Sequence, residues 1–128
     1  MSEPVVVAIL FADRLITEHN GKKGIIGVFN QFQAQAFPVS FPPWGIYIAM
    51  TNLQGKHEFA LELTHEESEQ VIIPIKGQLE VPSQNEVIDL IFNIENAIFP
   101  QPGRHILSVY VDGNIAGSRL LQVEKIPK

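Results

Sequence analysis

Three side chains near the start of the chain, Asp13, Glu18 and His19, are of the types that bind divalent metal ions. Carboxylate oxygens and imidazole nitrogens suit several such ions. Asp13, however, follows an apolar run, and the other two lie in a polar segment typical of a turn, where such side chains usually bond to the local backbone. We interpret Asp13 as a turn-anchoring residue with Arg14 as a surface partner, and we expect no metal and no cofactor.

The chain has four histidines, at positions 19, 57, 65 and 105. His57 and His65 share one face of a predicted strand but stand eight positions apart. That separation is roughly 26 Å along a strand, so the two cannot bind one metal ion together. A metalloprotease helix needs a second histidine four positions after the first, and Glu69 occupies that place after His65. We interpret residues 65–69, His-Glu-Glu-Ser-Glu, as a solvated acidic loop.

Nucleophilic catalysis lacks its usual sequence signals in this chain. A catalytic serine needs a base and an oxyanion hole, and no serine lies in a Gly-x-Ser-x-Gly turn. The sequence has no glycine-rich phosphate loop either, because Gly21 and Gly24 flank two lysines in a composition typical of a hairpin. The sequence therefore predicts no catalytic residues and a protein that is not an enzyme.

Four aromatic residues, Phe37, Phe41, Trp44 and Tyr47, are the best candidates for a binding feature. Aromatic side chains carry large apolar areas and are enriched in the centres of interfaces, so these four form a possible interaction surface. The other interpretation is that segment 37–43, Phe-Pro-Val-Ser-Phe-Pro-Pro, crosses between two sheets and that its aromatics fill the end of a sandwich. Both interpretations stay open at this point.

The elements that position these residues are predicted to be strands. No window keeps a 3.6-residue period over the length of a helix, whereas alternation of apolar and polar residues recurs. Segment 70–81 is expected to hold one or two short strands, and 31–37 to extend the first hairpin. We predict an all-β fold, an antiparallel immunoglobulin-like β-sandwich of about seven to nine strands in one domain, 1–128. The main strands are predicted at 5–11, 24–30, 45–52, 57–64, 86–95, 104–112 and 116–124.

The closing hairpin has the clearest pattern. Its first strand alternates along 104–112, and Asp112-Gly113 favours a tight turn because both residues tolerate positive φ. We predict that the hairpin is scaffold and that its apolar alternate residues face the core: Leu107, Val109, Val111, Leu121 and Val123. Arg104, His105 and Arg119 are expected to be exposed or to lie at strand ends.

Composition excludes several functional classes. The chain has 128 residues, a formal net charge of -5 and a pI near 5.3, which argues against a general nucleic-acid binder. Its longest apolar run, 5–12, is far shorter than the ~20 residues of a membrane helix, and no signal-peptide cleavage site follows it. With no cysteines, the chain suits a reducing compartment. We predict a cytoplasmic protein that binds neither nucleic acid nor membranes.

Three stretches carry a resemblance to a known family: "ADRLITEHNGKKGIIGVFNQF" at 12–32, "FPVSFPPWGIYIAM" at 37–50 and "FPQPGRHILSVYVDG" at 99–113. They resemble a small bacterial family of uncharacterised single-domain proteins with an immunoglobulin-like β-sandwich. Asn30 departs from that pattern, where the family often has an acidic residue. The resemblance implies the fold and no particular activity.

The function is therefore unknown from sequence, and the best-supported hypothesis is a non-catalytic interaction or assembly module. Its partner is expected to be a second copy of the chain or an unidentified protein. One alternative is a small-molecule or carbohydrate-binding sandwich that uses Trp44 with Tyr47 or Tyr110 as stacking platforms. Another is a module dependent on a divalent metal bound by the acidic residues of its loops.

Overall fold

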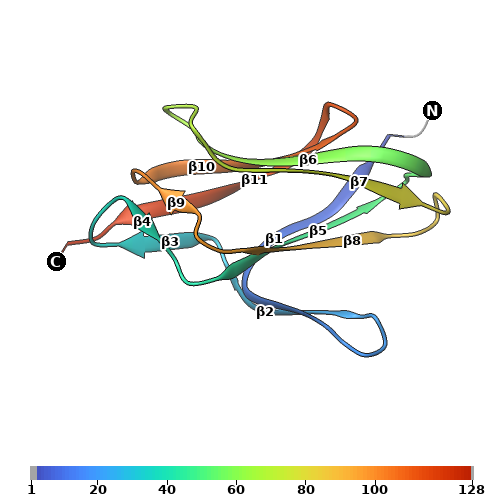
Figure 1. Cartoon of the computed structure of the whole chain (residues 1–128), viewed down its shortest axis with the longest axis horizontal. Helices are drawn as coiled ribbons and strands as arrows, with labels where there is room; N and C mark the ends of the chain where they lie inside the picture. Colours follow the sequence, from blue (N-terminus) through green and yellow to red (C-terminus); the bar gives the residue numbers. More distant parts are fainter. Residues whose placement is uncertain (1–2, 128) are drawn as a thin grey trace.

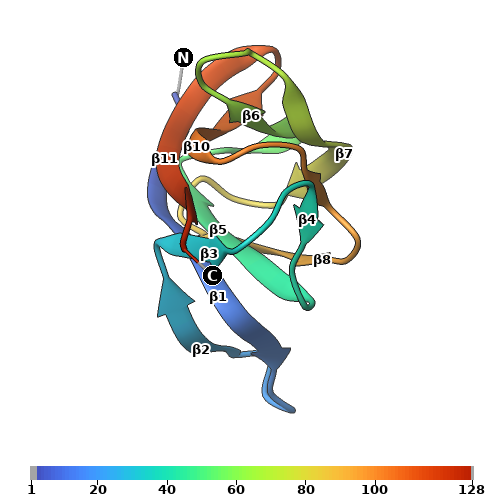
Figure 2. The same ribbon diagram turned by 90° about the vertical axis from the view of Figure 1, so that its left-hand side faces the viewer.

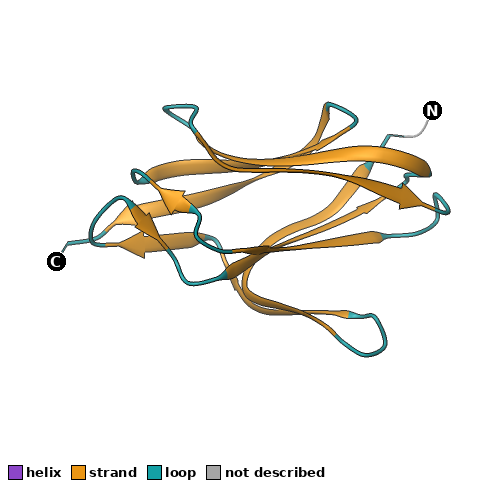
Figure 3. Cartoon of the chain, in the orientation of Figure 1, coloured by secondary structure: helices purple, strands orange, loops and turns teal. Residues whose placement is uncertain are grey.

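The computed structural model describes residues 3–127 and is all-β (Figures 1 and 3). Two sheets pack face to face, as Figure 1 shows from the side. Sheet A has the strand order β2-β1-β5-β8, with bounds Lys23–Phe29, Val5–Thr17, Trp44–Thr51 and Ile88–Ile94. Sheet B has the order β3-β11-β10-β6-β7, with bounds Gln31–Ala34, Asn114–Lys125, Gly103–Val111, Gly55–His65 and Val71–Val81. Two short strands, β4 (Val39–Ser40) and β9 (Ile98–Phe99), pair beside them.

The core lies between the two sheets, where the alternation predicted it. On β10 the side chains of Leu107 and Val109 are fully buried, and on β11 so are those of Leu121 and Val123. Facing them, β5 of sheet A buries Ile46 and other alternate residues. The predicted orientation of the closing hairpin is therefore confirmed. A period of two has this effect because successive side chains of a strand point to opposite faces.

Two expectations about the strands are wrong, and a third is wrong only in length. Residues 3–127 form eleven strands instead of about seven to nine. Segment 31–37 does not extend the first hairpin, since β3 pairs parallel with β11 in the opposite sheet, and the fold is thus not wholly antiparallel. Segment 70–81 is one continuous strand, β7, although it contains Pro74. Proline is tolerated there because β7 is an edge strand, and an edge strand has one side without ladder hydrogen bonds.

The expected exposure of His105 is also wrong, because its side chain is 0% exposed. It shares the inward face of β10 with Leu107 and lies opposite Leu121 on β11 and His65 on β6. Arg119 is partly buried as well, and its guanidinium donates hydrogen bonds to the carbonyl of Ile9, at 2.7 Å, and to the side chain of Asn30. The hairpin β10–β11 is scaffold to a greater extent than its sequence indicates.

The end of the β1–β2 hairpin projects away from the two packed layers (Figures 1 and 2). We call residues 13–28 the arm. None of the described residues forms a helix with the length and hydropathy needed to cross a membrane.

Candidate functional site

The proline-rich segment contributes aromatic rings to one end of the sandwich. Phe41 stacks on Phe32 of β3, with ring centres 4.0 Å apart and planes 7° apart, and lies 5.5 Å from the ring of Phe99. Trp44 is only 4% exposed and makes edge contacts with Phe32 and Phe11. These contacts place Trp44 in the core cluster, with Phe41 and Phe37 partly buried against it.

Tyr47 is not brought together with the other three aromatic candidates. It lies three positions after Trp44 on β5, on the opposite face of the strand, opposite Leu10 and Ile91 of the neighbouring strands. Its hydroxyl donates a hydrogen bond to Asp89, at 2.6 Å, and burial, with the help of Asp89, raises the pKa of Tyr47 to about 12. Of the three proposed stacking platforms, Trp44 is thus enclosed and Tyr47 is held by a carboxylate.

Tyr110, the third platform, lines a shallow hollow of about 610 Å³ on the outer face of sheet B. In one cross-strand row, Tyr110 of β10, Ala60 of β6 and Lys76 of β7 are neighbours. Ala60 has a small side chain, so it leaves space between its larger neighbours, and Glu58 and Glu62 flank it along the same strand. This hollow is where a small hydroxylated ligand would find an aromatic ring beside hydrogen-bonding groups.

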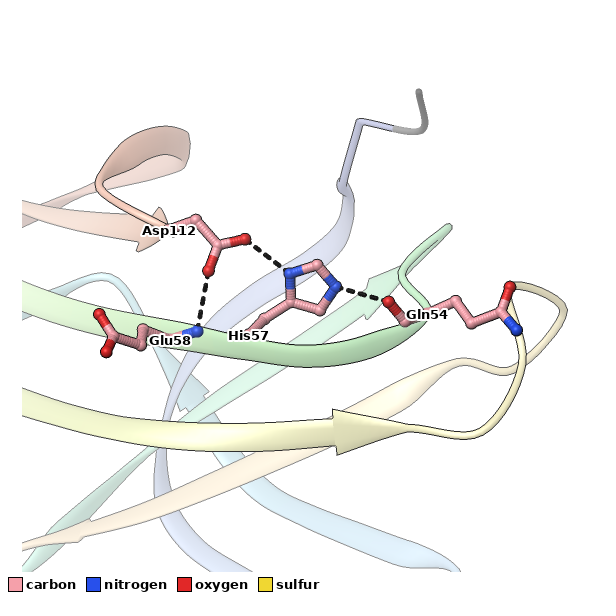
Figure 4. A network of polar contacts seen from close by, with 4 residues as sticks. All are labelled: Gln54, His57, Glu58 and Asp112. Carbon is pink, nitrogen blue, oxygen red and sulfur yellow. Dashed lines mark hydrogen bonds and ion pairs between the residues drawn. The ribbon is translucent and has the colours of Figure 1, made fainter.

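A second polar group fastens the turn between β10 and β11 to the start of β6 (Figure 4). His57 Nδ1 lies 2.6 Å from a carboxylate oxygen of Asp112, and His57 Nε2 lies 2.8 Å from the carbonyl oxygen of Gln54. The other oxygen of Asp112 accepts a hydrogen bond from the backbone N–H of Glu58, at 2.9 Å. Because both ring nitrogens face acceptors, both must donate, so the site favours the imidazolium form.

This arrangement sets the titration of both groups and leaves His57 without the free nitrogen that a general base needs. Hydrogen bonding to Asp112 raises the pKa of His57, and the same bond lowers the pKa of Asp112. A general base needs a free lone pair within reach of a substrate proton, and neither nitrogen of His57 has one. The group therefore acts as a structural latch.

Replacing His57 by glutamine is expected to lower the melting temperature by about 1–3 °C near pH 5.5 and by less near pH 9. The raised pKa of His57 means that its contribution is fully present below the pKa of an unfolded histidine, about 6.5, and is lost as pH rises through the raised value. Melting curves across pH measure this difference. His19→Gln, at an exposed position, is the control, and a difference that grows toward pH 9 would contradict the latch.

The acidic segment 65–69 is not simply solvated, because His65 is 4% exposed. Its Nδ1 accepts a hydrogen bond from the backbone N–H of Ser68, at 3.1 Å, and the Ser68 hydroxyl lies 2.8 Å from the same nitrogen. Its Nε2 donates to the carbonyl of Pro102, at 3.0 Å. His65 thus connects the β6–β7 turn to the start of β10, with Glu66, Glu67 and Glu69 exposed around it.

His65 packs edge-on against His105, with ring centres 5.0 Å apart. His105 Nδ1 donates to the carbonyl of Gly103, at 3.0 Å, while its Nε2 is buried without a hydrogen-bond partner within residues 3–127. Burial lowers the pKa of His105. The sequence pattern missed this pair because cross-strand pairing brings the two residues together, 40 positions apart.

The metal candidates are not brought together into a ligand set. Within residues 3–127 there is no group of three or more His, Asp or Glu side chains that could hold a metal ion. Asp13 is exposed, and its carboxylate lies against the backbone of Gly27. A Cβ atom added to Gly27 would lie 2.3 Å from Oδ2 of Asp13. Gly27 is in the left-handed region, at φ 73°, so Asp13 lies beside a conformation that glycine favours.

The arm carries apolar surface that was not among the predicted site residues. Ile16 and Ile26 lie on one of its faces and are 40% and 48% exposed, and Val28, beyond the irregularity at Gly27, is 52% exposed. On the other face, the side chain of Leu15 covers Gly45. A Cβ atom added to Gly45 would lie 2.6 Å from Cδ1 of Leu15. The signal in the sequence was the run Gly24 to Phe29, which is apolar at every position other than glycine, whereas a strand with one solvated face alternates.

No curated protein matches this chain. Similar solved structures include the Pseudomonas fluorescens alkylpurine DNA glycosylase AlkC bound to abasic-site DNA, at 10% identity and a TM-score of 0.49, and the Listeria innocua beta-glucosidase, at 10% identity and 0.48. The alignments cover 96% and 99% of this chain but only 31% and 17% of those proteins. A family model matches residues 7–124, and the chain therefore belongs to DUF6941, a family of unknown function.

Proposed function

We propose that the protein is a non-catalytic interaction module that binds a protein partner through the arm. The observation that carries this proposal is the exposure of three apolar side chains, Ile16, Ile26 and Val28, each 40% exposed or more, on a hairpin that projects from the sandwich (Figure 2). Apolar side chains grouped at the surface mark sites of protein contact more often than solvated faces. The absence of a free lone pair on His57 supports the non-catalytic part.

The proposal includes an immunoglobulin-like framework. In such domains one sheet contains strands in the order C, F and G, and the other contains strands A, B and E. The run β6-β10-β11 of sheet B corresponds to the first order and β1-β5-β8 of sheet A to the second. In this scheme β2 is an addition beside strand A, which is why the arm has no counterpart in the framework.

The proposal also includes a cytoplasmic bacterial protein without nucleic-acid or membrane partners. A chain without cysteine needs no oxidising compartment to fold, and a net charge of -5 opposes the approach of a polyanion.

The free energy of burying these side chains is smaller than the free-energy cost of association, so the arm must offer a partner further contacts. Burying the exposed half of one such aliphatic side chain stabilises a complex by about 1 kcal/mol, so three of them contribute about 3 kcal/mol. Association costs about 4–15 kcal/mol in lost freedom. The side chains alone are therefore insufficient, and the unpaired backbone groups of the edge strand β2 are the additional source of contacts.

The test is capture of a partner from a native lysate by the purified protein and by matched variants. The double substitution Ile26→Asp and Val28→Asp is expected to reduce capture at least about tenfold, since it places two charges in the interface. Val87→Asp, at a position 57% exposed outside the arm, is the control and should capture normally. Circular dichroism checks that all three proteins are folded.

Two outcomes count against the arm. Equal loss of capture in the Val87→Asp control would mean that any added charge interferes. The arm variant could still capture the partner while Tyr110→Ala does not. That result would favour the hollow on sheet B as the binding site, and with it the alternative of a small-molecule or carbohydrate-binding protein.

A further inference from the structure

We propose that the partner of the arm is a second copy of this chain, which pairs with β2 in antiparallel orientation and joins the two copies of sheet A into one sheet. This inference rests on the proposed function, because it uses the same surface. A two-fold axis relates the copies, so each presents the same strand to the other.

The edge strands of the two sheets differ in their protection against such pairing. Natural edges are protected by charges, by proline or by short length. The edge β7 has Pro74 and Lys76, the edge β8 has Asp89, and the edge β3 is only four residues long. The edge β2 has one charged residue, Lys23 at its first position. Among the described residues, β2 is therefore the edge most open to pairing with another strand.

The hairpin geometry indicates which backbone groups of β2 face outward. The backbone N–H of Glu18 donates to the carbonyl of Lys22, at 2.8 Å, so this residue pair is hydrogen-bonded. Bonded and non-bonded pairs alternate along an antiparallel ladder. Lys23 and Ile25 then direct their N–H and C=O groups away from β1. Gly27, at φ 73°, interrupts the regular stretch, and within this proposal the two-fold axis lies at Ile25, whose outward groups pair with those of Ile25 in the second copy.

This register is compatible with the side chains. With Ile25 opposite Ile25 of the second copy, Ile26 lies opposite Gly24 of the second copy, so a large residue faces a small one. Lys23 lies opposite Gly27 of the second copy, and like charges do not meet. The exposed side chains of Ile26 in both copies then lie on one face of the joined sheet, where each adds to the apolar contact between the copies.

Charge opposes contact between the bodies of two copies more than contact between their arms. Residues 13–28 contain three Lys or Arg and two Asp or Glu, a net charge of 3 − 2 = +1. The rest of the chain has 9 − 3 = 6 basic and 14 − 2 = 12 acidic residues, a net charge of -6. Two acidic bodies repel each other, and pairing at the tips of projecting arms keeps them apart.

The test uses the lack of cysteine in the chain, because any introduced cysteine is then unique. Only the central residue of a two-fold antiparallel pair meets its own copy, at a Cα separation of about 5.5 Å, within the range of a disulfide. Two positions away the separation is on the order of 14 Å, beyond that range. Ile25→Cys is therefore expected to form dimers on oxidation at least about tenfold faster than Lys23→Cys, and than the exposed control Val87→Cys.

Sedimentation of the unmodified protein completes the test. The mass is expected to rise from 14.3 kDa toward twice that value with concentration, and the change Ile26→Asp and Val28→Asp should remove the rise. Equal cross-linking at all three positions would overturn the register and the proposal. A mass that stays at 14.3 kDa would also overturn it, even if Ile25→Cys failed to fold. If that unmodified monomer still captured a lysate protein through the arm, self-pairing would be wrong and the proposed function would stand.

Discussion

Replacing Phe99 by alanine is expected to lower the free energy of unfolding by about 3–5 kcal/mol. Its side chain is 0% exposed. The centre of its ring lies 6.0 Å from the ring centre of Phe32, 5.5 Å from that of Phe41 and 5.2 Å from that of His105. The substitution leaves a cavity where the proline-rich segment meets the histidine pair. A domain of this size has only about 5–15 kcal/mol in total, so the loss is a large fraction, and urea denaturation measures it.

The neighbouring residue is a matched control. Ile98 belongs to the same short strand β9, but its side chain is 59% exposed. Ile98→Ala should cost less than about 1 kcal/mol, because little buried surface is removed. Equal losses for the two variants would show that β9 contributes through its backbone alone and that the aromatic cluster does not hold this end of the sandwich together.

Leu121→Ala is expected to cost about 2–5 kcal/mol, because Leu121 is 0% exposed and lies opposite His105 in the closing hairpin. Arg104→Ala, one residue before His105, should change the unfolding free energy by about 0–1 kcal/mol. Arg104 pairs with Glu66 at 3.1 Å, but both side chains are half exposed, at 56% and 50%. The contrast between the two variants measures how far the hairpin is scaffold.

A small loss for Leu121→Ala would contradict the assignment of the hairpin faces. Ile106, Ser108 and Tyr110 would then have to point inward instead. Denaturation curves for both variants, with the same slope as the unmodified protein, make the comparison valid because an unchanged slope means an unchanged exposure on unfolding.

The strands that alternate strictly could be predicted from sequence, and those that depend on distant contacts could not. Leu107, Val109 and Leu121 face the core because a period of two admits only that solution once one face is apolar. The parallel pairing of β3 with β11 joins segments about 90 positions apart, as in Phe32 opposite Val123. No local pattern in either segment indicates such a pairing, because parallel neighbours need no turn between them.

The candidate site was predicted only in part for the same reason. The aromatic content of segment 37–44 was visible, but the stacking of Phe41 on Phe32 depends on where β3 lies. His65 and His105 looked like a loop residue and a strand-end residue, and strand pairing buries both. The exposure of the arm could not be predicted from its sequence, because exposure, unlike alternation, depends on what the rest of the chain covers.

Hydrogen exchange along the chain tests the central claim, that the arm is the contact surface, most directly. The measurement compares dilute protein with concentrated protein, and with the protein bound to any captured partner. The claim predicts added protection confined to residues 13–28, strongest at the amides of Lys23 and Ile25, whose groups point away from β1. Protection that appears instead around Tyr110 and Ala60 on sheet B, with none in the arm, would contradict it.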